Sequence, residues 1–492
     1  MKRMNKNNRW SKRIGYVITL FQLIASIVFF VSLYKLGMLP NMYLVLIAEI
    51  LAILLLIMFL GQYNSKRKAI FGKLLSILMS VVLVFASTYV FKANGAVEEI
   101  SSGGKKLDKV VVAVLKSDPA ETIKDAKDYN FGVQYQIKSE EIHETIDAIN
   151  DEVGASIKTT ECSGIQEQSE VLNQGNGNAI IVNEAYLGLL EDESGDFSDN
   201  IKIIYSHEIE TDVDESVLNA SQNDITKNPF IVYISGIDVY GAIETNSRSD
   251  VNILAVVNPT SHQILLVTTP RDFYVEFPGV TNGQLDKLTH AGIYGVDVSM
   301  ATLGKLYDAD IDFYARVNFT SLVEMVDALG GIDVNSEYAF TTVGGLNVSQ
   351  GMNHFNGKQA LSFSRERKNL AAGDFQRGKN QQAVITAMIQ KIVSPAILTG
   401  ASDLIKSVAG NVDTNMSQEQ IQSLIKSQLA NPQSWKIKSI AAEGTGDMQI
   451  CYSMPSTPLY VTQPNPDSVN NVKSAISSVL NGETFDDSVV TQ

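Results

Sequence analysis

The sequence predicts three N-terminal transmembrane α-helices followed by two extracellular α/β domains. Three long apolar runs lie within the first 91 residues. Strand-like and helix-like stretches alternate through the rest of the chain, and the composition changes near Asn228. A chain of 492 residues is also too long for one typical hydrophobic core, which favours more than one folded unit.

The three apolar runs are long enough to cross a membrane as helices. Ile14–Tyr34 and Leu74–Phe91 hold 21 and 18 uncharged residues, and Met42–Leu60 holds 19 residues with Glu49 as its only charge. A helix of about 20 apolar residues spans ~30 Å of hydrocarbon. A secretory signal has one shorter run and a cleavage site, so we expect three retained spans within residues 14–91.

The basic residues around the spans predict their orientation. Residues 1–13 contain six Lys and Arg, the second loop contains four, and the first loop contains only Lys35. Cytoplasmic flanks of membrane helices retain positive charge. We therefore expect a cytoplasmic tail at residues 1–13 and, beyond the third span, a large region outside the plasma membrane.

Charge and cysteine content exclude some classes of protein. Beyond residue 94 the chain has 27 basic and 53 acidic residues. A field of that sign repels nucleic acid, so we expect no contact with DNA or RNA. The only two cysteines, Cys162 and Cys451, cannot form a disulfide framework, and we favour two free thiols over a single bridge.

The first part of the outer region predicts a tether and an accessory domain. Residues 92–108 include the small, polar stretch GAVEEISSGGKK, which is typical of a tether. Residues 109–226 place the strand-like runs KVVVAVLKS, NAIIVN and IKIIYS between amphipathic stretches, which predicts an α/β domain. This segment has no arginine and no glycine-rich phosphate loop, so we assign it no chemistry.

A second α/β pattern begins at residue 227. Three apolar strands follow one another closely, and DFYARVNFTSLVEMVDALGG then reads as strand, amphipathic helix and glycine stop. NQQAVITAMIQKIVSP and SQEQIQSLIKSQLA have helical spacing. This pattern predicts helices packed on a sheet, with a domain core at residues 227–395, its C-terminal part at 396–482 and a tail at 483–492.

Arginine is confined to one region of the outer part. All six arginines beyond the spans lie in the second α/β pattern: Arg248, Arg271, Arg316, Arg365, Arg367 and Arg377. The planar guanidinium matches phosphate and carboxylate oxygens, although surface ion pairs are the alternative. Asp238 and Arg271 directly follow apolar strands, and Asp250 directly precedes one. Ligand sites of open α/β sheets gather at strand ends, so we predict a bound anion there.

Carboxylates beside arginines suit a diphosphate bound with Mg²⁺. Mg²⁺ takes one or two protein carboxylates and bridges phosphate oxygens, while arginines neutralise the remaining charge and stabilise a pyrophosphate leaving group. Arg365 and Arg367 would share one face of an extended strand. Asp374, Arg377 and Gln381 would share one side of the first turns of a helix. We expect the two elements to converge on one anion.

Five short stretches carry a resemblance to a known family. They are RSD at 248–250, TPRDFYV at 269–275, KLTHA at 287–291, VDALGGIDV at 326–334 and SRERKNLAAGDFQRGKNQQ at 364–382. In sequence, order and spacing they resemble the LytR-CpsA-Psr family of Gram-positive cell envelopes, over about residues 228–395. The three spans and the extra outer domain are similar to the capsule-associated, CpsA-type branch.

The resemblance implies a phosphotransferase-type ligase. Such an enzyme transfers a glycopolymer from undecaprenyl pyrophosphate to a hydroxyl of peptidoglycan as a phosphodiester, with Mg²⁺, and releases the polyprenyl phosphate. It implies a central mixed β-sheet flanked by helices, an apolar pocket for the lipid tail, and other capsule or wall assembly proteins as partners. Two alternatives stay open, a lipid-pyrophosphate hydrolase and a non-catalytic membrane regulator of polymer assembly.

The resemblance also implies roles for individual residues. It places the magnesium ligands at Asp238 and Asp250. It places the pyrophosphate ligands at Arg248, Arg271, Arg365, Arg367, Arg377 and Gln381. Among these, Arg248, Arg271 and Arg377 are expected to be catalytic together with Asp374, which would accept a proton or orient an arginine.

The remaining polar candidates are interpreted as structural. Asp272 is expected to anchor Arg271, Arg316 to form an ion pair, and His290 to be a hydrogen-bonded structural histidine. Lys368 and Lys379 are expected to be solvated surface. The apolar residues of the helix near Leu322 belong mostly to the core, and periodicity does not tell which of them line the lipid pocket.

Overall fold

The computed structural model describes residues 6–61, 66–100, 105–136, 138–175, 177–194, 197–213, 224–237, 243, 245–371, 373–392 and 412–483. The chain divides into two compact units. The first comprises residues 1–102, 391–410 and 416–434, and the second comprises residues 103–390, 411–415 and 435–492. Each unit is described by itself.

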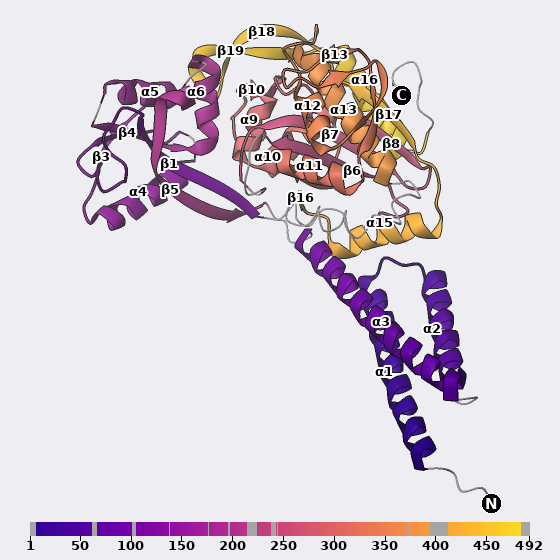
Figure 1. Cartoon of the computed structure of the whole chain (residues 1–492). Coiled ribbons are helices and arrows are strands. Elements are labelled where there is room, and N and C mark those ends of the chain that lie inside the picture. The colour runs from indigo at the N-terminus through magenta and orange to yellow at the C-terminus, as the bar shows by residue number, and fades with distance from the viewer. Residues whose placement is uncertain are drawn as a thin grey trace, which may run out of the picture. The chain divides into compact units, whose positions relative to one another are not determined.

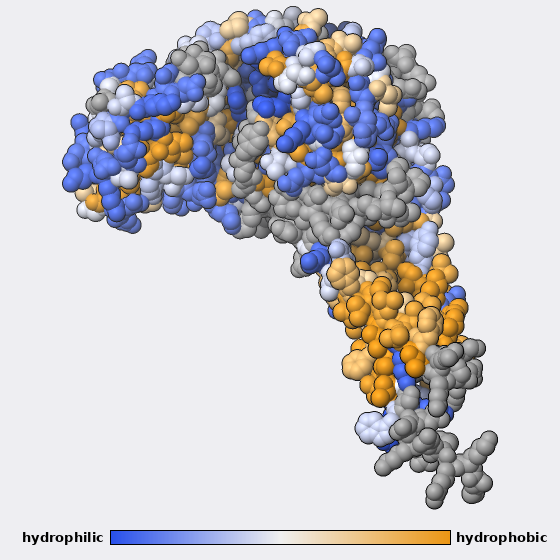
Figure 2. Space-filling view, in the orientation of Figure 1, coloured by the Kyte–Doolittle hydropathy of each residue, from blue (hydrophilic) through white to orange (hydrophobic). Residues whose placement is uncertain are grey.

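Three apolar helices make up most of the first unit. They are α1 (Lys6–Leu36), α2 (Asn41–Gly61) and α3 (Lys66–Ile100). Each contains a segment long and apolar enough to cross a membrane, at Lys12–Leu36, Asn41–Gly61 and Ile70–Lys92. Their surface is predominantly hydrophobic (Figure 2). The prediction of three helices that could span a membrane is therefore confirmed.

Helix α3 corrects the expected tether. We expected residues 92–108 to be a linker, but α3 continues through AVEEI to Ile100, and strand β1 begins at Lys105. A single glycine in a helix costs only about 1 kcal/mol relative to alanine, so Gly95 does not end the helix.

Helix α15 (Gln418–Ala430) also differs from expectation, because it belongs to the first unit. Its N-terminus is capped by Ser417, and the Gln418 side chain donates to Asn94 Oδ1 of α3 at 3.2 Å. No residue of α15 is buried. We had assigned this segment to the C-terminal part of the catalytic domain.

The second unit contains two separate sheets. The first has five strands in the order β3-β2-β4-β1-β5, and β2 runs parallel to β3 and β4 while β1 runs antiparallel to β4 and β5. Its strands are β1 (Lys105–Leu115), β2 (Asn130–Val133), β3 (Lys158–Glu161), β4 (Asn178–Asn183) and β5 (Ile201–Asp212). Between them lie α4 (Ser139–Val153), α5 (Ile165–Asn173), η1 (Glu184–Tyr186), α6 (Leu187–Ser194) and α7 (Phe197–Asn200).

The second sheet is mixed, as the sequence predicted. Its order is β16-β11-β6-β7-β8-β17, with parallel pairs β11–β6 and β8–β17 and antiparallel pairs elsewhere. The strands are β6 (Phe230–Ile237), β7 (Ser249–Asn258), β8 (Gln263–Thr268), β11 (Phe313–Val317), β16 (Val412–Thr414) and β17 (Lys436–Ala441).

Helices cover both faces of the mixed sheet (Figure 1). One face packs on α9 (Leu288–Tyr294), α10 (Val296–Tyr307) and α16 (Pro466–Leu480), and the other packs on α13 (Gly373–Ile392). The predicted order of strand, helix and glycine stop is confirmed by β11, α11 (Phe319–Ala328) and the left-handed Gly330 and Gly331. Helix α12 (Gly357–Arg365) precedes α13.

Short hairpins complete the second unit, and one of them joins the two sheets. The paired strands are β9 (Tyr274–Glu276) with β10 (Leu285–Lys287), β12 (Ile332–Ser336) with β15 (Gly351–Phe355), β13 (Phe340–Thr341) with β14 (Asn347–Val348), and β18 (Gly444–Cys451) with β19 (Met454–Pro464). Met454 and Val461 of the last pair pack in one buried cluster with Val111 and Ile180 of the first sheet. The first sheet thus shares a core with the rest of the unit rather than standing apart.

Candidate functional site

A cavity of about 700 Å³ opens beside one end of the mixed sheet. Six predicted anion-binding side chains line it: Arg248, Arg271, Arg365, Arg367, Arg377 and Gln381. Asp250 lines it as well. These residues are up to 133 positions apart in the sequence, and the fold brings them to one chamber.

Asp250 and Arg271 form an ion pair in this wall. Arg271 Nη1 lies 2.6 Å from Asp250 Oδ1, and both side chains are almost buried. Thr289 donates to the same carboxylate oxygen at 3.2 Å. Burial alone would raise the pKa of Asp250, but the charges of Arg271, Arg248 and Arg377 outweigh burial and lower it. Asp250 is therefore ionised at neutral pH.

We had expected Arg365 and Arg367 to share one face of an extended strand. The structure contradicts this, because neither residue lies on a strand. Arg365 ends helix α12, and Glu366 follows it as an extended cap. A capping box of Asn356 and Gln359 starts this helix, so the helical register is set upstream of the arginines. The Arg365 guanidinium stacks over the Phe319 ring at 4.1 Å from the ring centroid, which holds its plane at the cavity wall.

Glu366, which sequence reasoning missed, organises the loop that carries Arg367. Its carboxylate accepts backbone N–H groups from Val343 at 2.6 Å, Asn369 at 2.9 Å and Arg367 at 3.0 Å. Burial raises the pKa of Glu366, but these backbone donors outweigh burial and lower it. An acidic residue between two arginines was the only signal in the sequence.

Arg248 contacts helix α6, and its two sequence neighbours lie against α9. Its Nη1 donates to the Gly188 carbonyl of α6 at 3.3 Å. On the other side, a Cβ at Gly292 of α9 would lie 2.5 Å from the Ser247 carbonyl oxygen and 2.9 Å from the Ser249 nitrogen. Only glycine lets this helix approach the Arg248 segment so closely.

Helix α13 contributes Arg377 and Gln381, which lie one turn apart and both line the cavity. This agrees with the predicted helical spacing. The position of Asp374 falls in the same helix, but its side chain lies outside the described residues.

Apolar residues also line the cavity, among polar ones such as Asn318, Lys358 and Ser362. The lining includes Ile234, Ile237, Val251, Val317, Phe319, Leu322, Leu361, Val384 and Ile385. Of the apolar residues of α11 that we considered, Leu322 lines the cavity, whereas Val326 and Leu329 are buried. The cavity lining therefore combines basic and apolar side chains.

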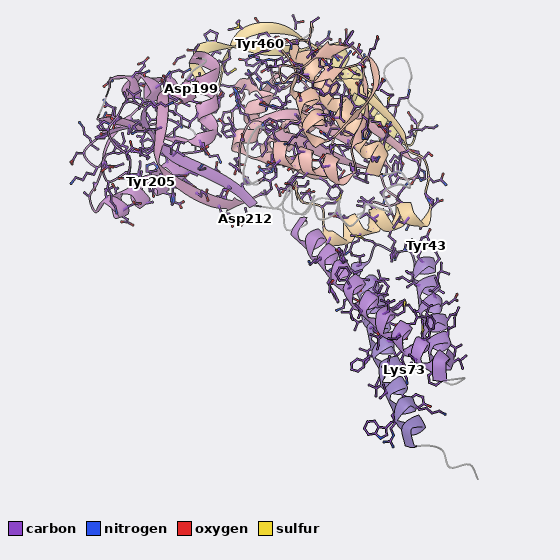
Figure 3. The ribbon with its side chains drawn as sticks, in the orientation of Figure 1. Tyr43, Lys73, Asp199, Tyr205, Asp212 and Tyr460 are labelled. Carbon is purple, nitrogen blue, oxygen red and sulfur yellow. The ribbon has the colours of Figure 1, made fainter. Side chains whose placement is uncertain are left out.

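A second cavity of about 330 Å³ shares part of this wall. It is lined by Asp250, Arg271, Arg377 and Gln381, together with polar groups such as Glu443 and Tyr460. Figure 3 labels Tyr460, which comes from β19. The shared residues can thus be approached from two sides.

The described residues fit a magnesium ion only in part. They contain no cluster of three or more His, Cys, Asp or Glu side chains that could hold a metal. Asp250 supplies one ionised carboxylate at the cavity wall, while Asp238, the other expected ligand, lies outside the described residues. One or two carboxylates suffice for Mg²⁺ when a substrate supplies phosphate oxygens.

Three residues that we interpreted as structural are held by buried partners. Arg316 forms an ion pair with Asp413 at 2.6 Å. His290 Nδ1 lies 2.7 Å from Asp286, and the His290 ring is fully buried. Asp272 lies 3.8 Å from Arg271 Nε but only 2.6 Å from Lys287 Nζ, so Lys287 is its nearer partner.

Lys368 and Lys379, both expected to be solvated surface, differ in their surroundings. Lys379 lies 3.2 Å from Glu337 at the surface, as expected. Lys368 is exposed but also lines the large cavity beside Arg367. We had interpreted it only as solvated surface.

The described residues form an α/β protein with a cavity that is lined by arginines and apolar side chains. The chain belongs to the LytR_cpsA_psr family, because the family model matches residues 199–467, more than half of its length. This membership makes the chain an enzyme of the transferase class.

Two curated relatives share the name TagU. A polyisoprenyl-teichoic acid–peptidoglycan teichoic acid transferase TagU from Bacillus cereus is 35% identical over 209 residues, which cover 42% of this chain and 67% of the relative. TagU from Enterococcus faecalis is 34% identical over 226 residues, covering 45% and 73%. The crystal structure of B. subtilis TagU is 30% identical, covers 53% of this chain and 100% of that chain, and gives a TM-score of 0.41.

Proposed function

We propose that the chain transfers a glycopolymer from a polyprenyl-pyrophosphate carrier to peptidoglycan as a phosphodiester. The observation that carries the proposal is one cavity lined both by six side chains suited to bind an anion and by apolar side chains. A polyprenyl pyrophosphate combines an anionic head with an apolar tail, and both halves find a matching surface there. The names of the relatives point to the same substrate class.

The residues suggest how the transfer would proceed. The acceptor hydroxyl oxygen forms a bond to the phosphorus that carries the glycan, and the bond from that phosphorus to the bridging oxygen breaks. The bridging electron pair leaves with the polyprenyl phosphate, and the hydroxyl proton passes to a base, for which Asp374 stays our candidate. Arg271 and Arg377 lie between the two cavities and would stabilise the charge that develops on the leaving phosphate.

Mg²⁺ stays part of the proposal, with Asp250 and Asp238 as its ligands. When bound, the ion would neutralise phosphate charge. Asp250 has a second role that needs no metal, because it fixes Arg271 through their ion pair at 2.6 Å.

The proposed location follows from the same chemistry. Peptidoglycan lies outside the plasma membrane, so the second unit would have to be extracellular and the N-terminus cytoplasmic. The basic residues flanking α1 and α3 support this orientation. The polymer would be a capsular polysaccharide or another wall glycan of a Gram-positive bacterium.

The test is reconstitution with the full chain in detergent. The protein is incubated with Mg²⁺, a polyprenyl-pyrophosphate-linked saccharide and peptidoglycan, and phosphodiester-linked saccharide is measured on the washed wall. Omission of peptidoglycan is the control. Lipid binding without any linked product would contradict the proposal, and release of free saccharide phosphate despite excess acceptor would favour a hydrolase.

A further inference from the structure

The β18–β19 hairpin has a buried face and an exposed face, and the exposed face carries apolar side chains. Val461 packs in the buried cluster that the hairpin shares with the first sheet. On the opposite face, Met448 and Tyr460 are direct cross-strand partners, and Ile450 follows Met448 by two residues. Met448, Tyr460 and Ile450 are 58%, 54% and 45% exposed, and we call them the hairpin platform. Since the solvent face of an antiparallel pair is ordinarily polar, an exposed apolar cluster there favours a role in binding.

The hairpin platform continues into the second cavity. Gly446 and Thr462 form the next cross-strand pair on the same face, and both line that cavity together with Tyr460. A Cβ at Gly446 would lie only 2.8 Å from the Tyr460 hydroxyl oxygen, so the end of the tyrosine ring lies over this glycine. The tyrosine therefore belongs both to the exposed platform and to the cavity wall.

Two hydrogen bonds fix the hairpin to the segment that carries Arg271. The Thr462 N–H donates to the carbonyl of Asp272, the residue after Arg271, at 2.7 Å. The Tyr274 hydroxyl donates to the Ile450 carbonyl at 2.5 Å. The platform is therefore held in a defined position relative to the arginine.

The large and the second cavity share four side chains but differ in the rest of their lining. The shared residues are Asp250, Arg271, Arg377 and Gln381. Leucine, isoleucine, valine and phenylalanine side chains contribute to the lining of the large cavity. None of the described residues that line the second cavity is of these four types. A polyprenyl tail therefore suits the large cavity and not the second one.

We propose that the second cavity and the hairpin platform bind the acceptor glycan strand of peptidoglycan. The inference rests on the proposed function. In phosphoryl transfer the attacking and leaving oxygens lie roughly in line, on opposite sides of the phosphorus. With the departing polyprenyl phosphate in the large cavity, the acceptor hydroxyl would reach the shared arginines through the second cavity. The carried glycan stays on the phosphorus and takes neither of these two positions.

A glycan strand matches both parts of this surface. Each pyranose ring has an apolar C–H face and an edge of hydroxyl groups. The C–H faces can pack on the platform, which removes apolar surface from water. The hydroxyl groups can form hydrogen bonds with polar residues of the cavity, which include Thr462 and Glu443.

Two variants remove the platform in different ways. Tyr460→Ala deletes the ring, whereas Tyr460→Phe keeps it. Met448→Ser/Ile450→Ser deletes the aliphatic part. Ile203→Ser/Met352→Ser is the matched control, because these side chains are 44% and 66% exposed on β5 and β15 and line none of the cavities described above. Substitutions at such exposed positions seldom affect folding.

The experiment measures the affinity of the full chain in detergent, loaded with polyprenyl pyrophosphate, for soluble uncrosslinked glycan strands of peptidoglycan. Tyr460→Ala and Met448→Ser/Ile450→Ser should each lower this affinity about 5- to 10-fold. Tyr460→Phe and the control pair should lower it less than about twofold. In the transfer assay, the two platform variants should raise the KM for glycan strands by a similar factor and leave the KM for the lipid-linked saccharide unchanged.

Three results would overturn the proposal. The first is unchanged strand affinity in both platform variants. The second is a loss confined to the lipid-linked saccharide, which would assign the platform to the carried glycan. The third is an equal loss for polyprenyl pyrophosphate without sugar, which would mean that the hairpin acts only by holding Arg271.

The direct binding assay separates this inference from the proposed function. Strand binding that depends on the platform, without any transfer by the unmodified protein, would support the platform and refute the proposed function. Transfer by an unmodified protein that binds no soluble strand would refute the platform and support the proposed function.

Discussion

Arg271 Nη1 lies 2.6 Å from Asp250 Oδ1, and this ion pair forms part of the wall of both the large and the second cavity. An arginine fixed in this way keeps its remaining N–H donors in a defined direction. The Asp250 carboxylate would therefore support the proposed anion binding through Arg271, although its own charge is negative.

Asp250→Asn keeps the shape of the side chain but removes its charge. We expect kcat/KM for transfer to fall on the order of 100-fold, because Arg271 loses its ionic partner and the proposed metal loses a ligand. The measurement is linked saccharide per unit time. Lys305→Ala is the control, since Lys305 forms an exposed pair with Glu276. Near-normal turnover in Asp250→Asn would remove this residue from the site.

Lysine replacements test the need for a planar guanidinium. Arg365→Lys and Arg367→Lys should each impair turnover by about tenfold or more, because the charge survives while the planar fork of donors is lost. In Arg365→Lys the stacking on Phe319 is weakened as well. Lys379→Arg, at the surface pair with Glu337, is the reverse exchange and should change nothing. Unchanged activity in both arginine variants would place them outside the site.

Glu366→Gln should reduce stability at pH 7 by about 1.5–3 kcal/mol, since the charged acceptor of three backbone N–H groups becomes neutral. The pKa of Glu366 is lowered in the folded state, so its contribution is present above the ordinary value of 4.5 and is lost as pH falls below it. The difference in Tm between the two proteins should therefore shrink from pH 7 to pH 4. A difference independent of pH would contradict this account.

Leu322→Trp should fill part of the apolar side of the large cavity. We expect binding of a long polyprenyl pyrophosphate to weaken about tenfold or more, while a soluble pyrophosphate without a tail is little affected. Glu324→Trp adds the same bulk at an exposed position of the same helix and is the control. Equal effects of the two tryptophans would argue against a tail pocket at this wall.

Both cysteines are buried and unpaired in the part of the chain that the structure describes. Burial raises the pKa of Cys162 to about 11, and it also raises the pKa of Cys451. The thiolate is the reactive form, so neither thiol should react with a maleimide at pH 7 until the protein is unfolded. Mass spectrometry counts the modified thiols, and a bridge found before reduction would refute this.

The sequence was informative where a local rule decides the structure. Apolar run length predicted the three helices, and strand and helix periodicity predicted helices packed on a sheet, while the mixed order of that sheet was implied by the family resemblance. Confinement of arginine to one region pointed to side chains that the fold does bring together. Arg377 and Gln381 needed only helical spacing to be placed on one side.

Other features depend on contacts that no local pattern contains. Arg365 lies on a helix because a capping box begins nine residues earlier, at Asn356. Glu366 gains its role from Val343, which is 23 positions away. The first sheet reaches the site through Leu107 and Asp108, which lie within the segment that we expected to be a tether.

Gly292 shows that a residue without any reactive group can shape a site. Helix α9 can lie against the backbone on either side of Arg248 only because this position has no Cβ. The glycine binds nothing and carries no charge, yet the distance it permits sets where the guanidinium stands. Its contribution is the absence of a side chain, which polar residues alone would not reveal.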